Sequence, residues 1–268
     1  MITLHNVTFA YEDTDNIFKR LNLTLNEPGI YGLLGENGIG KTTLLKLMSG
    51  IYFAIVGTIK IDDKDVSKRD VDTMSKIYFM PDTISEVNLT FDNFVKCYSP
   101  FYKNFSKSIL DDCLKAFGID SSRKISAMSL GEKKKAFMSF ALAVQTEILL
   151  MDEPSNGMDI TSKKIFRQLL MKYCGEEQYI IISTHLVSDV ENIIDHLIIL
   201  ADNENVFNAS SSEITNRYTF GTSSSAEDAL YAEKSAGGYK VIMPNDGEES
   251  EIDIVMLYNA VIKGKINE

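Results

Sequence analysis

Apolar and polar residues alternate near the start of the chain, over residues 2–9 and again over residues 18–25. A period of two is typical of strands with one buried face, so this pattern predicts a pair of antiparallel strands. Residues 29–35, GIYGLLG, are almost continuously apolar and end in glycine, and KTTLLKLMSG after them has helical spacing. The pattern therefore predicts a buried strand, a glycine loop and a helix in succession, with further strands over residues 57–61 and 76–80.

The pattern becomes helical over residues 91–127, where aromatic residues recur at spacings of three to four. A second helix in this region is predicted over residues 106–117. The strands predicted next cover residues 147–152, 178–183 and 196–200, and the helices between and after them residues 161–173 and 186–194. Strands that alternate with helices favour an α/β fold with a mostly parallel sheet covered on both faces. Beyond about residue 218, Ser, Gly and Asp interrupt short apolar stretches, and a last helix is predicted within IDIVMLYNAVIKGK.

The composition is that of a globular protein. The chain has 268 residues, 44% of them hydrophobic and 24% charged, which suits one large α/β domain with an appendage or two small domains. The formal net charge is -11, and because nucleic-acid binding needs a basic surface, we expect no nucleic acid as the main partner. The three cysteines are widely spaced and predict neither a metal site nor thiol catalysis.

The sequence does not suggest a membrane span or a secretory signal. No apolar run reaches the roughly 18 residues that a membrane-spanning helix needs. The first residues, MITLHNVTFAY, lack a basic region followed by a long apolar core. We therefore expect a soluble, cytoplasmic protein whose membrane role, if it has one, comes through a partner.

Residues 35–42, GENGIGKT, fit the phosphate-loop pattern G-x-x-x-x-G-K-[ST], between a predicted strand and a predicted helix. Glycines allow the backbone to wrap around phosphate, and the start of the helix adds its positive dipole end. Lys41 is expected to reach the β- and γ-phosphates, and Thr42 to bind Mg²⁺. The alternative is a chance glycine turn, and the strand and helix around the loop argue against it.

The segment ILLMDEP, residues 148–154, is an apolar strand that ends in two carboxylates. Asp152, at the carboxyl end of this strand, is placed to hold Mg²⁺, usually through water. Glu153 is placed to polarise the water that attacks the γ-phosphate. A surface turn after any strand would look similar, so the functional interpretation depends on the phosphate loop.

Residues 128–135, MSLGEKKK, resemble the ABC signature, usually written LSGGQ. Ser129, Gly131 and Glu132 match it, and Leu130 replaces the first glycine. Ser129 and Glu132 also form the pattern of a capping box that begins a helix. The two interpretations are compatible, because a capped helix N-terminus is an anion site. In ABC proteins this end faces the γ-phosphate held by the opposite subunit.

Three more features follow the motif order of the ABC family. SNGMD, residues 155–159, resembles the D-loop that crosses the dimer interface, and ISTHL, residues 182–186, resembles the switch-histidine segment. Tyr11 resembles the aromatic residue that stacks on adenine. Taken singly, a histidine such as His185 or a tyrosine in a sheet is more often structural. The resemblance covers about residues 1–215 and is nearest to bacterial exporter ATPases, in which a separate polypeptide supplies the membrane domain.

The resemblance implies an ATPase that uses ATP and Mg²⁺. Lys41, Glu153 and His185 would be catalytic. The residues implied to contact ATP are Tyr11, Gly35, Asn37, Gly38, Gly40, Lys41, Thr42, Thr43, Ser129, Gly131, Glu132 and Asp159. The residues implied to bind Mg²⁺ are Thr42, Asp82 and Asp152.

Asp82 is a departure from the family. The family's Q-loop has glutamine after a strand and a proline, whereas YFMPD places Asp82 there. Its shorter, charged side chain is a candidate contact of Mg²⁺ or water, or it merely follows Pro81 in a turn. We expect metal affinity and coupling to a membrane partner to differ from the family norm.

The implied architecture is a P-loop core with a mostly parallel sheet, an N-terminal antiparallel β subdomain and an inserted helical subdomain at about residues 83–145. Residues 1–215 would form the ATP-binding domain and residues 216–268 a small C-terminal extension. The mechanism needs two copies, as a homodimer or heterodimer. A multi-span membrane permease would hold them at the inner face of the cell membrane. Coupling would run through residues 82–128, whose aromatic stripe is either a docking groove or core packing.

Three functions remain open from the sequence. The first is the motor of an exporter, and the second is a soluble ABC ATPase that drives assembly or regulation. The third is a P-loop GTPase or kinase, which would carry a guanine-reading NKxD stretch or an acceptor site, and the sequence contains no NKxD.

Overall fold

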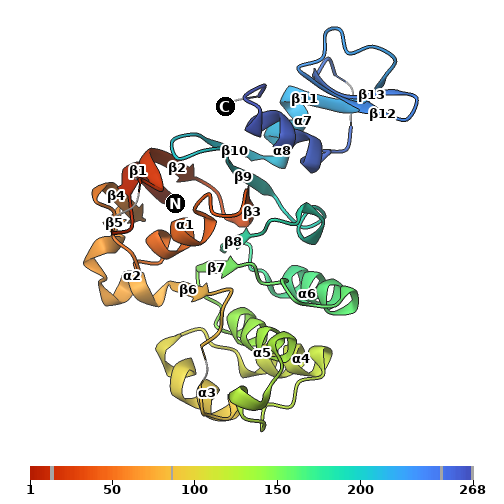
Figure 1. Ribbon diagram of the computed structural model, residues 1–268. Coiled ribbons are helices and arrows are strands. Elements are labelled where there is room, and N and C mark those ends of the chain that lie inside the picture. Colours follow the sequence, from red (N-terminus) through yellow and green to blue (C-terminus); the bar gives the residue numbers. More distant parts are fainter. Residues whose placement is uncertain (13–14, 86, 248–249, 267–268) are drawn as a thin grey trace.

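A mostly parallel sheet runs through the middle of the molecule in the computed structural model, which describes residues 1–12, 15–85, 87–247 and 250–266. Its strands, in their order across the sheet, are β10 (Val206–Ser210), β9 (His196–Leu200), β3 (Gly29–Gly35), β8 (Tyr179–Ser183), β7 (Ile148–Asp152) and β6 (Ile77–Met80) (Figure 1). Neighbouring strands from β9 to β6 are parallel, and β10 is antiparallel to β9. The predicted strands and the α/β class are confirmed.

An antiparallel sheet formed by the N-terminal part lies beside the central one. Its strands, in order, are β2 (Phe18–Leu25), β1 (Ile2–Phe9), β4 (Val56–Ile61) and β5 (Lys64–Asp65). Ile2 lies opposite Leu25 and Phe9 opposite Phe18, so the pair predicted from the alternation is confirmed. The helix α1 (Lys41–Met48) follows the glycine loop, and the short α2 (Val71–Ser75) precedes β6.

Helices gather at the other end of the molecule, at the bottom of Figure 1. They are α3 (Phe91–Tyr98), α4 (Lys107–Phe117), α5 (Leu130–Ala143) and, beside them, α6 (Ile160–Tyr173). The aromatic stripe is divided between two environments. Phe91 and Phe94 are buried against Phe137 of α5, whereas Phe101 exposes 71% of its surface. Core packing therefore accounts for the inner part of the stripe.

The central sheet separates two parts of the core. Leu149 and Met151 of β7 belong to the apolar cluster of the helices, together with Phe166 of α6. Ile148 and Leu150, which point the opposite way, belong to the cluster of α1 and the antiparallel sheet. Successive side chains of a strand face opposite sides. Because β7 is buried on both faces, its sequence is a continuous apolar run.

The C-terminal part adds a small sheet and two helices. The elements are α7 (Ser211–Arg217), β11 (Tyr218–Ser223), β12 (Tyr231–Ser235), β13 (Gly238–Pro244) and α8 (Ile254–Ile262), and the strand order is β11-β13-β12. The predicted last helix is confirmed as α8. Residues 248–249 and 267–268 of the expected extension lie outside the described residues. α8 packs on the central sheet, since Leu257 shares an apolar cluster with Leu34 and Ile199.

The prediction of a helix over residues 186–194 is wrong. The structure has only a 3-10 turn at Val187–Asp189, followed by irregular chain. Two physical reasons explain this. The segment is rich in β-branched residues, which have low helix propensity, and Asp189 turns its carboxylate inward to bond Ser155 and Lys163.

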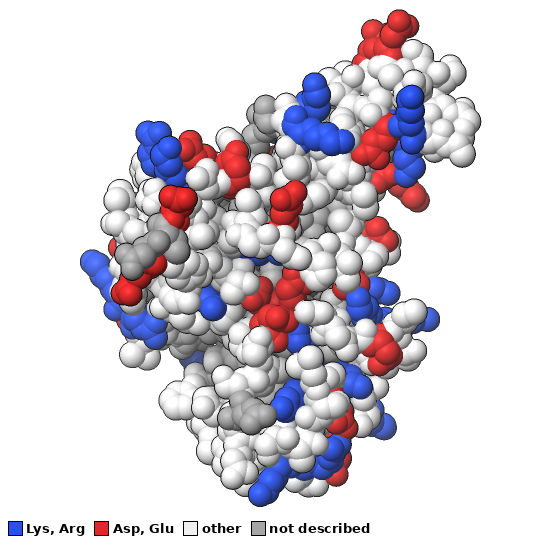
Figure 2. Space-filling view, viewed as in Figure 1, with Lys and Arg blue, Asp and Glu red and all other residues white. Residues whose placement is uncertain are grey.

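Within the described residues, the helices are too short or too polar to cross a bilayer. Figure 2 shows one face, on which Lys and Arg side chains stand in separate groups and acidic side chains gather near the middle.

Candidate functional site

The carboxyl ends of the parallel strands meet at one edge of the central sheet. Glycine 35 ends β3, Asp152 ends β7 and Ser183 ends β8, and Asp152 lies opposite Ser183 in the ladder. In open α/β sheets this edge is where ligands bind. Most of the predicted catalytic residues lie here.

The phosphate loop connects β3 to α1 through left-handed backbone. Gly38 has φ 86° and Gly40 has φ 113°, a region that L side chains rarely adopt. A Cβ at Gly40 would also lie 2.8 Å from the ring of Phe18, so glycine is required there on two grounds. Asn37 and Gly38 are exposed, and the loop therefore presents its backbone to solvent.

Lys41 is 6% exposed and folds back onto the loop. Its Nζ donates to the carbonyl oxygens of Gly35 at 2.8 Å and Glu36 at 3.1 Å. Burial lowers the pKa of Lys41, and the nearby Glu153 and Asp152 carboxylates oppose that shift. The ammonium is thus held beside the acidic strand end, where an anionic ligand would also favour its charge.

Thr42 and Asp152 are joined directly. The Thr42 hydroxyl donates to Asp152 Oδ2 at 2.7 Å, and the Ser183 hydroxyl donates to Asp152 Oδ1 at 2.7 Å. Asp152 is 2% exposed, so these hydroxyls orient a carboxylate that has little contact with water. Ser183 was not predicted as a site residue, and the signal that the sequence offered was its place in ISTHL at the end of a predicted strand.

Glu153 and His185 form the next pair along this edge. His185 Nδ1 lies 2.9 Å from Glu153 Oε2, and their side chains are 38% and 14% exposed. Glu153 has φ 44°, a left-handed conformation that costs a non-glycine residue on the order of 1–3 kcal/mol. Its N–H donates to the carbonyl and hydroxyl oxygens of Ser183 at 3.1 Å each, which helps to hold this conformation.

Lys134 of α5 is a residue that the sequence interpretation missed. It is 1% exposed, and its Nζ donates to Asp82 Oδ1 at 2.5 Å and to the carbonyl of Glu153 at 2.7 Å. Among the described residues, no interaction connects Asp82 with Thr42 or Asp152. The structure therefore pairs Asp82 with Lys134.

Ser129, Gly131 and Glu132 lie at the N-terminus of α5, and the predicted capping box is confirmed. The Ser129 hydroxyl accepts from the Glu132 N–H at 3.2 Å, and Glu132 Oε2 accepts from the Ser129 N–H at 2.8 Å. The backbone N–H of Ser129 and the Arg123 guanidinium lower the pKa of Glu132 to about 2. A Cβ at Gly131 would lie 3.6 Å from the carbonyl of Gly157 in the SNGMD segment. The signature residues thus lie beside SNGMD.

Asp159, at the end of SNGMD, caps α6. Its carboxylate accepts from the N–H of Ser162 at 2.9 Å and the hydroxyl of Ser162 at 2.7 Å, and these bonds lower its pKa. The start of the same segment is anchored separately, because Ser155 donates to Asp189 at 2.6 Å. Asp189 is 4% exposed and also pairs with Lys163. SNGMD is therefore fixed at both ends.

Tyr11 lies over α1. Its hydroxyl is 2.8 Å from the Thr43 hydroxyl, and its ring packs edge-on against Phe9 and Tyr52. The ring is 39% exposed. An aromatic surface beside the phosphate loop can stack on a base, so this placement fits the expected adenine contact.

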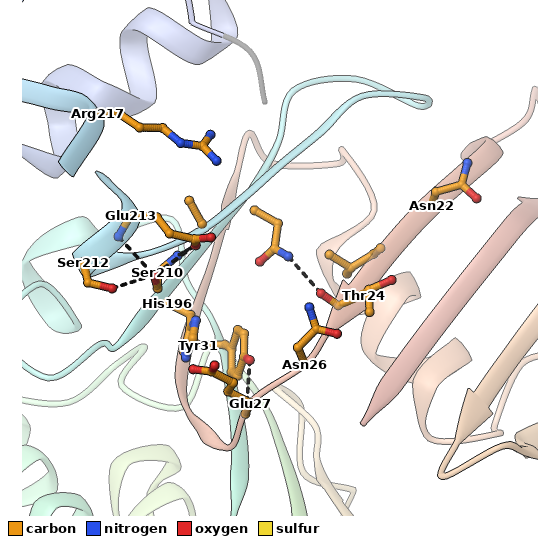
Figure 3. A pocket seen from close by; sticks show the side chains of 13 residues that line it. Asn22, Thr24, Asn26, Glu27, Tyr31, His196, Ser210, Ser212, Glu213 and Arg217 are labelled. Carbon is orange, nitrogen blue, oxygen red and sulfur yellow. Dashed lines mark hydrogen bonds between the residues drawn. The ribbon is translucent and has the colours of Figure 1, made fainter. Parts of the chain in front are cut away.

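The larger cavities differ in their relation to this edge. One of about 610 Å³ lies at the amino ends of β3 and β9, where Tyr31 stacks on His196 and Glu213 and Arg217 form part of the wall (Figure 3). It is therefore at the opposite edge of the sheet from the phosphate loop. Another, of about 440 Å³, lies between the phosphate loop, the His185 segment and α8.

Comparison with known proteins decides the family. The family described as "ABC transporter" matches residues 18–156. The chain belongs to the ABC transporter ATP-binding family. It is therefore an ATP-binding subunit, an ATPase in which hydrolysis is coupled to transport, and this separates it from P-loop GTPases and kinases.

Named relatives agree with this ABC ATPase assignment. The chain is 28% identical over 217 residues to the ABC transporter ATP-binding protein NatA of Bacillus subtilis (strain 168), covering 77% of this chain and 88% of NatA. It is 31% identical over 190 residues to the cytochrome c biogenesis ATP-binding export protein CcmA of Reclinomonas americana, covering 69% and 84%. The dimeric structure of a bacterial ABC transporter cassette shares the fold, with TM-score 0.67, 23% identity and coverage of 78% and 98%.

Proposed function

We propose that this ABC ATPase dimerises on ATP and powers export through a separate membrane-spanning partner. The observation that carries the proposal is the pair Glu153–His185 at 2.9 Å, on the same sheet edge as Lys41 and Asp152. A general base, its orienting partner, a phosphate-binding lysine and a hard carboxylate are the parts that phosphoryl transfer to water needs.

Thr42 and Asp152 fit a magnesium site. Both offer hard oxygen ligands, they already touch at 2.7 Å, and the Asp152 carboxylate is 2% exposed, so bulk water does little to solvate its charge. When bound with ATP, Mg²⁺ would neutralise charge on the β- and γ-phosphates. The sequence also predicts Asp82 as a ligand, and the Mg²⁺ requirement of an Asp82→Ala variant distinguishes that role from a pairing with Lys134 alone.

The chain's own residues support a hydrolytic step. Lys41 would hold the β- and γ-phosphates, and the Glu153 carboxylate would accept a hydrogen bond and then a proton from the attacking water. The bond from the γ-phosphorus to the bridging oxygen breaks, and ADP leaves with that oxygen. His185 would contact the γ-phosphate and orient Glu153. The phosphate-loop glycines and Asn37 would hold the triphosphate, with Tyr11 on adenine.

The second half of the site would come from another subunit. Ser129, Gly131 and Glu132 lie at the N-terminus of α5, which is 14 residues long, and Ser129 caps it. A helix N-terminus attracts anions. In the dimer this end, with Asp159 nearby, would approach the γ-phosphate held by the partner's phosphate loop. A dimeric cassette among the similar structures supports this arrangement.

We propose the division into an ATP-binding domain (1–215), with a helical subdomain at about 83–145, and a C-terminal extension (216–268). The helical subdomain would contact a multi-span permease and place the protein peripherally at the inner face of the cell membrane. The name of the relative CcmA, an export protein, supports the direction of transport.

The test is to recover tagged Glu153→Gln protein from native cells in mild detergent with ATP and to identify what accompanies it by mass spectrometry. A stoichiometric multi-span membrane protein is the expected result. The double variant Lys41→Ala/Glu153→Gln, which should not hold ATP, is the matched control for dependence on the nucleotide. If only soluble partners are recovered while a control membrane complex survives, the export proposal is wrong and an assembly or regulatory ATPase replaces it.

A further inference from the structure

The buried cation Lys134 is unusual for its place in the sequence. It is the middle residue of the run Lys133–Lys135, yet it is 1% exposed while both neighbours are partly exposed. Charged side chains are almost never fully buried unless they are paired. Its partners should therefore explain why a lysine stands here.

Those partners belong to two different parts of the site. One is the carboxylate of Asp82, which follows β6 where the chain passes into the helical segment, and the other is the main-chain carbonyl of Glu153. Lys134 itself is on α5, the helix that begins at the signature residues. A single ammonium group thus connects α5, the segment after β6 and the backbone of the proposed catalytic carboxylate.

The contact with Glu153 is made at a residue with left-handed backbone. Glu153 has φ 44°, so its peptide would relax if the bonds around it were lost. The Glu153 N–H donates to Ser183, and the Glu153 carbonyl accepts from Lys134 Nζ at 2.7 Å and from the N–H of Asn156 at 3.2 Å. Together these bonds fix the backbone of Glu153, whose carboxylate lies 2.9 Å from His185 Nδ1.

We propose that Lys134 is a positioning residue for hydrolysis, which holds Glu153 in its working orientation, and that Asp82 serves as its charge partner and not as a ligand of Mg²⁺. The inference rests on the proposed role of Glu153. It also assigns a purpose to the departure at position 82, since an acid there neutralises the buried lysine. Movement of the helical segment that separated Asp82 from Lys134 would act directly on the Glu153 backbone.

The experiment compares Lys134→Met, Asp82→Ala and the double variant, with Lys133→Met as the matched control. Met fills the space of the lysine stem without its charge. For each protein, kcat and KM for ATP hydrolysis, the dissociation constant for ATP, the thermal unfolding midpoint and the Mg²⁺ concentration at half-maximal activity are measured.

Lys134→Met should lower kcat between about tenfold and 100-fold, because a misplaced catalytic group is costly. Its KM and ATP dissociation constant should stay within about threefold of the wild type, since ground-state binding does not use Lys134. Lys133→Met should keep kcat within about twofold. Asp82→Ala should lower the unfolding midpoint, because it leaves a buried cation without its carboxylate.

The double variant separates positioning from stability. It removes both charges, so it should unfold at a higher temperature than Asp82→Ala while its kcat stays as low as that of Lys134→Met. If kcat recovers together with the unfolding midpoint, Lys134 is only structural and the proposal is overturned. A roughly tenfold rise in the Mg²⁺ requirement of Asp82→Ala would also overturn it, because Asp82 would then behave as a metal ligand.

Glu153→Gln in the same series distinguishes this inference from the function on which it rests. If Glu153→Gln is inactive and Lys134→Met is normal, only the role of Lys134 fails. If Glu153→Gln hydrolyses ATP normally, the proposed catalytic carboxylate fails and the inference fails with it.

Discussion

At the scale of single residues, three charged side chains are buried at or beside the edge of the central sheet where the carboxyl ends of its strands meet. Lys41, Asp152 and Lys134 are 6%, 2% and 1% exposed. Such groups are stable only when hydrogen-bonded or paired. Lys41 bonds loop carbonyls and Asp152 bonds hydroxyls, both weaker partners than a triphosphate or a cation. Lys134 already has a carboxylate. The first two are therefore suited to bind a ligand, and the third to hold the site together.

Lys41→Ala should abolish tight ATP binding. The ammonium would make charge-assisted bonds to two phosphates, and losing bonds of about 1.5–3 kcal/mol each corresponds to a dissociation constant raised roughly 100-fold or more. Equilibrium dialysis with labelled ATP measures it. Lys60→Ala, which alters an exposed lysine of β4, is the control and should bind ATP as the wild type does. Unchanged affinity of Lys41→Ala would contradict the assignment.

The sequence predicted the place of the phosphate loop, Asp152 and His185 at or just after the ends of buried strands, because each lies in a motif tied to a strand end. Lys134 was missed because three consecutive lysines are typical of a solvated helix face. One signal was available. Lys134, Phe137, Met138 and Ala141 recur at the spacing of one helix face, and all are buried. A lysine in line with apolar residues indicates a buried charge with a partner.

At the scale of elements, the segment after β8 shows where pattern and structure disagree. Its apolar spacing suggested a helix, but Val187–Asp189 forms only a 3-10 turn. The reason is a tertiary contact that no local pattern contains, namely the bonds from Asp189 to Ser155 and Lys163. These bonds tie the turn after the switch-histidine segment to Ser155 of SNGMD and to Lys163 of α6. The small C-terminal sheet was equally hidden, since its short strands are interrupted by polar turns.

Asp189→Ala should destabilise the protein by about 2–4 kcal/mol, because it leaves Lys163 and the buried Ser155 hydroxyl without their acceptor. Urea unfolding followed by circular dichroism measures the free energy. Asp111→Ala is the control, since Asp111 pairs with Lys107 on the exposed face of α4 and should cost about 1 kcal/mol or less. Equal free energies of unfolding for the two variants would show that the bonds of Asp189 to Ser155 and Lys163 do not stabilise the fold.

At the scale of the whole molecule, the site residues fall into two groups. Lys41, Asp152, Glu153 and His185 lie at the carboxyl edge of the central sheet, and the signature residues lie with SNGMD at the start of α5. Among the described residues, no hydrogen bond joins Ser129 or Gly131 to the phosphate loop. A second copy would bring the two groups together around one ATP. Contacts between ATP and the second copy, which exist only in that arrangement, would shift the equilibrium from monomer to dimer.

The measurement that tests this account most directly is the mass of Glu153→Gln protein in solution, with and without ATP and Mg²⁺, by analytical ultracentrifugation. The account predicts a monomer without nucleotide and a stable dimer that retains one unhydrolysed ATP per subunit. Adding Lys41→Ala should abolish the dimer. A Glu153→Gln protein that hydrolyses ATP at the wild-type rate, or that stays monomeric when saturated with ATP, would contradict it.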